Sequence, residues 1–153
     1  ELVEGIRNQY SQNLSDKNLS LVNGVDKDFN LFYSKEVFQT VIRNLLTNAI
    51  KFSPQNQRIL VDNMESENHF SLRVHNMAEE VDEEKLGKIN SGQIVTSALG
   101  TKQEKGSGKG LFICKRMLKK NNGGLKLSKD SKGVTAEIRI YKSIPLQPNL
   151  GLA

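Results

Sequence analysis

The sequence has little cysteine and no long apolar run, and both shortages restrict the class of protein. Cys114 is the only cysteine among 153 residues, so no disulfide can form within the chain, and such usage fits a reducing compartment. Two histidines and one cysteine, far apart in sequence, lack the spacing of a zinc site. No apolar run approaches the ~18 residues of a membrane span, and no charged-then-apolar signal segment opens the chain. The first residue is Glu1 rather than Met, which predicts a fragment of a longer protein.

The charge of the chain is unevenly distributed. The net charge is +5, but residues 1–99 hold 10 basic and 14 acidic groups, whereas residues 100–153 hold 12 basic and 3 acidic groups. A block as basic as the second indicates a surface that faces phosphate, nucleic acid or anionic lipid, or else a solvated basic face without a ligand. With 37% hydrophobic and 25% charged residues, the chain is expected to be globular rather than disordered or fibrous.

Hydrophobic periodicity predicts helices and mostly paired strands along the chain. We expect, in order, a helix at 1–14, short strands at 18–22 and 29–33, and a long helix capped by Ser34 and ended by Ser53-Pro54. Strands at 58–64 and 69–76, a short helix around 83–89, an irregular stretch at 90–109, a helix at 110–121 with a C-cap at 122–124, and strands at 125–129 and 134–141 follow.

Strands in adjacent pairs favour a two-layer α/β (α+β) sandwich over a doubly wound parallel sheet. We expect a mixed, mainly antiparallel sheet of about five strands, covered on one face by about three helices. Residues 1–142 would form this domain, and the segment 143–153, with two prolines, would be a C-terminal tail or linker.

One polar stripe lies on the long helix. Asn44, Asn48 and Lys51 are spaced i, i+4, i+7 and therefore share one face beside a broad apolar one. Amide oxygens suit a hard divalent cation that shares phosphate oxygens, and a lysine one turn on can neutralise phosphate. The plainer alternative is two solvent-facing asparagines and a lysine whose stem lies along apolar surface.

A second motif stands where the irregular stretch meets the next helix. Gly106, Gly108 and Gly110 alternate there, which would let backbone N–H groups approach an anion at a helix N-terminus. The motif follows no strand and lacks a Gly-Lys-Ser/Thr ending, so it is neither a Rossmann fingerprint nor a P-loop. A flexible hinge is the alternative.

Together, in this order and about 60 residues apart, the two motifs resemble one family. The chain resembles the ATP-binding catalytic domain of sensor histidine kinases, in the superfamily that includes DNA gyrase. The resemblance is carried by an N box at residues 44–53 (NLLTNAIKFS), a lid end with a G2 box at 100–111 (GTKQEKGSGKGL) and a closing hairpin at 132–135 (KGVT). It implies the Bergerat-type form of the sandwich over residues 1–142.

The resemblance also implies roles for individual residues. Asn48 would ligate Mg²⁺ through its amide oxygen, and Asn44 would assist at the phosphates or the metal. Related ATPases carry a glutamate base at the position of Asn44, so the resemblance implies a kinase without autonomous ATP hydrolysis. The other contacts to ATP would come from Lys51 at phosphate, Phe52 in the nucleotide pocket, the backbones of Gly106, Gly108 and Gly110 around the phosphates, Lys105 as a mobile cation, and Leu111 and Thr135 near the purine.

The G1 box departs from the family pattern Asp-x-Gly-x-Gly. Strand alternation places Asn76 at the position of the aspartate that binds adenine, and Ala78 and Glu80 at the positions of the two glycines. Losing the charge replaces a hydrogen bond worth roughly 1.5–3 kcal/mol with one worth about 1 kcal/mol. A difference near 1.4 kcal/mol is about ten-fold in affinity, so we expect weakened Mg·ATP binding. The aromatic F box expected within residues 89–98 is not evident either.

By this resemblance the domain would bind ATP and Mg²⁺ and donate the γ-phosphate to a histidine on a separate dimerisation helix. Its partners would be that phosphoacceptor domain and the receiver domain of a response regulator, in the cytoplasmic part of a membrane-bound sensor. No catalytic residue is expected in the fragment itself. The basic Lys115, Arg116, Lys119 and Lys120 are expected to be solvated or to make docking contacts, whereas Lys109 would face the triphosphate.

Two alternatives remain open. One is a degenerate pseudokinase domain that docks proteins without binding ATP, which the altered G1 box supports and the intact N and G2 boxes oppose. The other is a nucleic-acid-binding domain that uses the basic half of the chain. This alternative is disfavoured because the chain has only 9 aromatic residues and no recognisable nucleic-acid-recognition motif.

Overall fold

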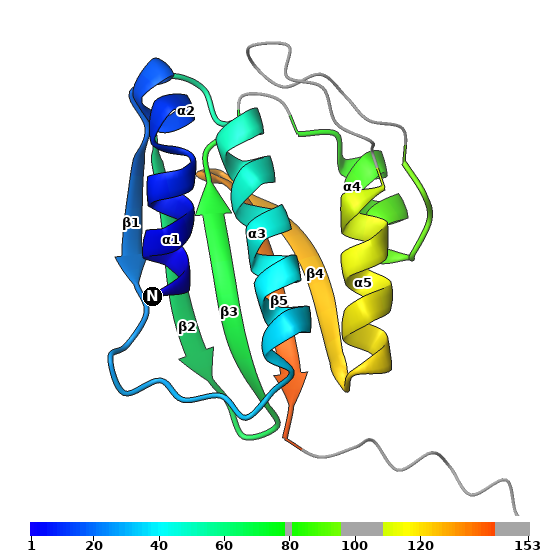
Figure 1. Ribbon diagram of the computed structural model, residues 1–153. Coiled ribbons are helices and arrows are strands. Elements are labelled where there is room, and N and C mark those ends of the chain that lie inside the picture. The colour runs from blue at the N-terminus through cyan, green and yellow to red at the C-terminus, as the bar shows by residue number, and fades with distance from the viewer. Residues whose placement is uncertain (79–80, 96–108, 143–153) are drawn as a thin grey trace, which may run out of the picture.

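The computed structural model describes residues 1–78, 81–95 and 109–142, and it has two layers (Figure 1). One sheet forms the back layer, and α1, α3 and α5 lie across one of its faces. In chain order the elements are α1 (Leu2–Gln9), α2 (Ser11–Asp16), β1 (Ser20–Gly24), α3 (Lys35–Phe52), β2 (Arg58–Glu65), β3 (His69–Asn76), α4 (Glu83–Asn90), α5 (Gly110–Lys120), β4 (Gly123–Asp130) and β5 (Gly133–Tyr141). The predicted two-layer α/β fold is confirmed.

The sheet has the strand order β1-β2-β3-β5-β4. β1 runs parallel to β2, and the other three neighbouring pairs are antiparallel. Because α3 lies between β1 and β2 in sequence, it supplies the crossover that a parallel pair needs. The sheet is therefore mixed and mainly antiparallel, as the sequence predicts.

The apolar face of α3 explains why this helix lies at the centre of the molecule. Ser34 caps it, with its side-chain oxygen accepting from the backbone N–H of Val37 at 3.4 Å. Four residues on its inner face are at most 2% exposed, and they pack with inward-facing residues of β2, β3 and β5: Val41, Ile42, Leu45 and Leu46. The outer face of α3 is left to polar side chains, the pattern of an amphipathic helix on a sheet.

Three predicted elements differ in detail. The N-terminal helix is interrupted at Tyr10, whose φ and ψ of −105° and 21° separate α1 from α2. Residues 29–33 form no strand: the ring of Phe29 lies edge-on to that of Phe70, at 6.2 Å between centroids, whereas Phe32 is fully exposed. The predicted C-cap glycines begin β4 instead, and Asn122 takes the left-handed turn with φ of 56°.

Within the described part of the chain, none of the helices has the length and apolarity that a membrane crossing requires.

Candidate functional site

The candidate residues gather at one end of the sheet. The C-terminal half of α3, the end of β3 and the beginning of α5 lie together at the upper end of the molecule in Figure 1. Contacts given below join these segments to the start of β5. Residues far apart in sequence therefore meet at the end of the sheet where β3 ends and β5 begins.

The two asparagines of the polar stripe contact each other. Asn48 Nδ2 donates to Asn44 Oδ1 at 3.2 Å, and the Thr47 hydroxyl donates to the Asn44 carbonyl at 3.0 Å. Both asparagine side chains are half-buried. The bond uses the amide nitrogen of Asn48, so its amide oxygen is the atom that a cation would take. Oxygen donors of this kind fit Mg²⁺ that keeps several waters.

The first glycine of α5 lies directly against this asparagine pair. A Cβ placed on Gly110 would be 2.3 Å from Asn44 Nδ2 and 2.9 Å from Asn44 Oδ1, so any larger residue here would require the Asn44 amide to move. The structure thus brings the N-box and G2-box positions into contact. The N–H groups of the first turn of α5, which have no acceptor within the helix, begin at the same place, and they form a region that favours an anion. Leu111 follows, half-buried and packed against the core.

The last turn of α3 supplies a cation and an aromatic ring. Lys51 and Phe52 are both half-buried, and Lys51 Nζ lies 5.1 Å from the centroid of the Phe52 ring. The pair stands one turn beyond Asn48 on the same helix. The position of Lys51 is thus compatible with binding phosphate, and that of Phe52 with lining a nucleotide pocket.

Asn76 ends β3 on the face of the sheet that the helices cover, and it is 8% exposed. Its Nδ2 donates to the Met77 carbonyl at 2.8 Å. Because this bond occupies the nitrogen, the amide oxygen is the group left to accept from a ligand. A Cβ on Gly133 would lie 2.2 Å from the Asn76 carbonyl oxygen and 2.8 Å from the Met77 Cα. The start of β5 is therefore packed tightly on the backbone of this segment.

The structure does not bring Thr135 to this group. Thr135 lies on the opposite face of the sheet, where its hydroxyl is 2.9 Å from His75 Nδ1. The side chains of a strand alternate between faces, so a one-residue offset moves a residue to the other side. Val134 has the inward position, and it pairs with Asn76 in the ladder. Three further candidates, Lys105, Gly106 and Gly108, and the altered G1 position Glu80 lie outside the described residues.

Lys115 is engaged inside the protein, contrary to the expectation that it is solvated or makes docking contacts. Its ammonium donates to the Asn90 carbonyl and, at 3.2 Å, to the Ile89 carbonyl, at the end of α4. Burial and then the nearby charge of Lys119 lower its pKa. Asn90 in turn exchanges two 2.8 Å bonds with the backbone of Leu127 in β4. These bonds anchor α4 to the sheet edge, and no sequence motif indicates them.

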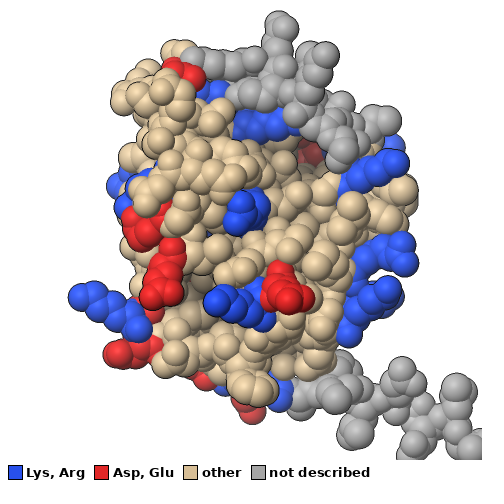
Figure 2. All heavy atoms as spheres, in the orientation of Figure 1, with Lys and Arg blue, Asp and Glu red and all other residues tan. Residues whose placement is uncertain are grey.

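The other basic residues of α5 are exposed. Arg116, Lys119 and Lys120 face solvent, and Lys and Arg side chains line this edge of the molecule in Figure 2. Arg116 also lies 5.7 Å from the ring centroid of Phe112. This edge agrees with the solvated or docking surface that the sequence predicts.

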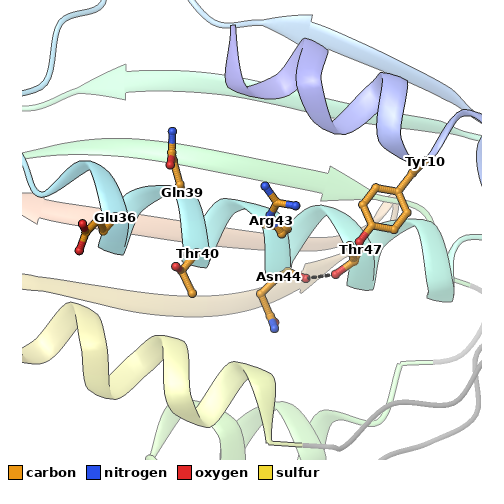
Figure 3. A pocket seen from close by; sticks show the side chains of 7 residues that line it. All are labelled: Tyr10, Glu36, Gln39, Thr40, Arg43, Asn44 and Thr47. Atoms are coloured by element: carbon orange, nitrogen blue, oxygen red, sulfur yellow. Dashed lines mark hydrogen bonds between the residues drawn. The ribbon is translucent and has the colours of Figure 1, made fainter.

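A groove of about 440 Å³ follows the outer face of α3 and includes Asn44 of the asparagine pair. Figure 3 shows its lining side chains, among which Tyr10 from the junction of α1 and α2 stands opposite the helix. Arg43 NH1 donates to Gln9 Oε1 at 2.7 Å beside it. The groove is lined by Tyr10, Glu36, Gln39, Thr40, Arg43, Asn44 and Thr47. Among the described residues, no group of three or more His, Cys, Asp or Glu could hold a metal, so a metal here would depend on amide oxygens.

Comparison with known proteins identifies similar chains. The profile of the family described as histidine kinase-, DNA gyrase B-, and HSP90-like ATPase matches residues 34–144. The chain is 28% identical over 113 residues to the probable sensor kinase SilS of Salmonella typhimurium, covering 72% of this chain and 23% of that protein. It is 24% identical over 142 residues to the sensor protein SrrB of Staphylococcus aureus, covering 92% and 24%. The chain thus spans about a quarter of the length of these relatives.

Solved structures share the fold. The catalytic domain of the histidine kinase ThkA superposes with a TM-score of 0.76 at 20% identity, covering 94% of this chain and 93% of that one. A mycobacterial sensor histidine kinase, MprB, superposes with a TM-score of 0.73 at 18% identity, covering 92% and 91%. At such identities the likeness concerns the fold alone.

Proposed function

Because the chain belongs to the histidine kinase-, DNA gyrase B- and HSP90-like ATPase family, we propose that it binds Mg·ATP and donates the γ-phosphate to a histidine on a separate helical domain. The observation that carries the proposal is the contact between Asn44 and Gly110, which joins the amide stripe to a helix N-terminus. A metal-binding amide and an anion-binding backbone are then adjacent, as a metal–triphosphate ligand requires. The nucleotide domain is proposed to occupy residues 1–142, followed by a tail.

The work of the domain would be positioning and charge neutralisation. Asn48 would hold Mg²⁺ through Oδ1, and its bond to Asn44 fixes the direction of the amide. Bound Mg²⁺ neutralises charge on the phosphates. Lys51 adds a second positive charge, and the first-turn amides of α5 receive phosphate oxygens. In this proposal no residue of the chain reacts covalently, and the phosphoryl group is transferred only when an acceptor histidine is held in line with it.

Asn76 would bind the adenine amino group through Oδ1. The bond from its Nδ2 to the Met77 carbonyl keeps the oxygen in the accepting position. A neutral acceptor makes a weaker hydrogen bond than a carboxylate, so affinity falls by about ten-fold relative to an aspartate at this position. Phe52 and Leu111 complete the apolar walls of the pocket, and the lid residues Lys105, Gly106 and Gly108 would add phosphate contacts.

The groove on α3 is the proposed docking place of the phosphoacceptor helix. Asn44 is among its lining residues, so a helix lying in it would bring a side chain close to the proposed position of the γ-phosphate. Glu36 and Arg43 offer one charge of each sign along the groove. We further propose that the full-length protein is a membrane-bound sensor with this domain in the cytoplasm, and that a response regulator's receiver domain takes the phosphoryl group onward. Nucleic acid is not a proposed partner.

A second candidate function is a docking module that binds no ATP. It is favoured by the G1 segment, where Ala78 and Glu80 replace glycines. It makes the same protein contacts but leaves the amide stripe unused. Nucleotide binding separates the two functions.

The deciding experiment is a calorimetric Mg·ATP titration of the chain beside its Asn76→Asp variant. We expect weak binding by the wild type and about ten-fold tighter binding by Asn76→Asp, because the carboxylate restores a charged acceptor. Asn13→Asp, an exposed substitution in α2 with the same charge change, is the control and should bind as the wild type does. Low-micromolar binding by the wild type would contradict the weakening, and no binding by any of the three would favour the docking module.

A further inference from the structure

Lys17 is a lysine buried in the protein, with 2% of its surface exposed. Its ammonium donates to two backbone carbonyls in the last turn of α3, to Ile50 at 2.9 Å and to Lys51 at 2.8 Å. Lysine is rarely buried without a specific reason. The reason here lies in how α3 ends.

Proline stops α3 and leaves carbonyls without helical donors. In a continuing helix the Ile50 carbonyl would accept from the N–H of residue 54, but residue 54 is Pro54, which has none. Ser53 takes an extended conformation with ψ of 134°, so the next helical donor is lost as well. Lys17 supplies both missing bonds, and its positive charge stands at the negative end of the helix dipole.

Lys17 is itself fixed in place by the backbone around it. Its carbonyl accepts from the N–H of Asn56 at 2.9 Å, and Asn18 Nδ2 donates to Asn56 Oδ1 at 2.8 Å. Asn18 and Asn56 both have positive φ, of 48° and 62°, which makes two tight turns that face each other. The turn after α2 and the turn after α3 are thereby joined as one unit.

We propose that Lys17 is a positioning residue for the metal–nucleotide site. It holds the last turn of α3, which carries Lys51 and begins just after Asn48, so it sets where the metal ligand and the phosphate-binding ammonium lie. The inference rests on the proposed function, since it assigns those two side chains to Mg·ATP. Without its two bonds the turn would fray, as helix ends without partners do, and the site would bind the metal complex less tightly.

The test is a pair of titrations with Lys17→Met, which keeps an unbranched side chain of similar bulk but removes the ammonium donors. We expect about ten-fold weaker binding of Mg·ATP and a smaller loss, about three-fold, for ATP with excess EDTA, because metal-free ATP loses the contacts of the last turn but has no metal for Asn48 to hold. Lys17→Arg, which keeps a charged donor, should stay within about three-fold of the wild type with Mg²⁺. Lys27→Met, an exposed lysine in the loop after β1, is the matched control.

Each outcome decides something. If Lys17→Met is less stable but binds Mg·ATP as the wild type does, Lys17 only stabilises the fold and the inference is wrong. If it weakens Mg·ATP and metal-free ATP equally, the effect is a general one and the inference is also wrong. If the wild type binds no nucleotide, the proposed function fails and this inference fails with it. Should Lys17→Met not fold, Lys17→Gln, which keeps a shorter neutral donor, replaces it in the same comparison.

Discussion

Gly133→Ala is expected to destabilise the protein by about 3 kcal/mol, because two separate effects add at this residue. Gly133 begins β5 with φ of 134°, a conformation that residues with a Cβ rarely adopt. The new methyl group would also lie 2.2 Å from the Asn76 carbonyl oxygen, 2.8 Å from the Met77 Cα and 3.0 Å from the Asn76 carbonyl carbon. All three atoms belong to the backbone of the neighbouring segment, so no side chain can rotate away to relieve the contact.

The magnitude follows from these two effects. Holding a residue in a sparsely populated conformation costs about 1–3 kcal/mol, and forcing extra volume into a packed site costs about 1–3 kcal/mol more. The smaller conformational entropy of alanine in the unfolded chain returns about 0.4–1 kcal/mol. A loss of about 3 kcal/mol is therefore the central expectation, and moving the Asn76 backbone should weaken Mg·ATP binding as well.

The assay is urea unfolding followed by circular dichroism, with Gly92→Ala as the matched control. Gly92 also has positive φ, of 82°, but a Cβ there would meet nothing within 4 Å. The control therefore measures the backbone effect alone, and it should lose about 1–2 kcal/mol less than Gly133→Ala. Equal losses in the two variants, or a loss below about 0.5 kcal/mol for Gly133→Ala, a size typical of neutral surface changes, would refute the reasoning.

Two further predictions concern half-buried charged side chains. Lys115→Met should lower the free energy of unfolding by about 1 kcal/mol, because two carbonyls at the end of α4 lose their charged donor. Lys120→Met, on the exposed face of α5, is the control and should change the free energy of unfolding little. Equal urea midpoints for the two variants would contradict the prediction. Burial raises the pKa of Glu137, but hydrogen bonds from Arg139 and Ser71 outweigh it and leave the pKa below its ordinary value of 4.5. The stability that Glu137 contributes is therefore complete above that pH and lost as the pH falls through the lowered pKa. Thermal unfolding should show a steeper acid loss for the wild type than for Glu137→Gln, and parallel curves would sink the prediction.

Local sequence signals predicted the elements well where the pattern is long. The helix expected from Ser34 to Ser53-Pro54 is found as α3 with that cap and that end. Its apolar residues recur every three or four positions over five turns, which leaves little freedom in assigning either its length or its buried face. The short strand expected at 29–33 rests on a much shorter pattern, and no strand forms there: Phe29 packs against Phe70, but Phe32 is exposed.

The site was predictable where it depends on spacing within one helix, and less so where it depends on register. Asn44 and Asn48 lie together because four residues separate them. Thr135 was assigned from a motif, although the alternation of Val134, Ala136 and Ile138 already indicates that it faces the other side of the sheet.

Lys17 and Lys115 could not be found from sequence at all. In a sequence, a lysine is expected to be a surface residue. The carbonyls that Lys17 and Lys115 bind belong to segments that only tertiary packing brings close to them. Their roles depend on helix ends elsewhere in the chain, which no local pattern around either lysine encodes.

The parallel pairing of β1 with β2 also has a consequence for the order of folding. The hairpins β2–β3 and β4–β5 close short loops, whereas β1 can join β2 only after the whole of α3 has been brought across the sheet. Because β1 also lies at the edge of the sheet, with β2 as its neighbouring strand, we expect the N-terminal segment, residues 2–24, to open before the four antiparallel strands separate. Lys17 belongs to that segment. An opening of residues 2–24 would release the end of α3 while the four antiparallel strands stay paired, and hydrogen exchange would detect it as a separate unit of lower stability.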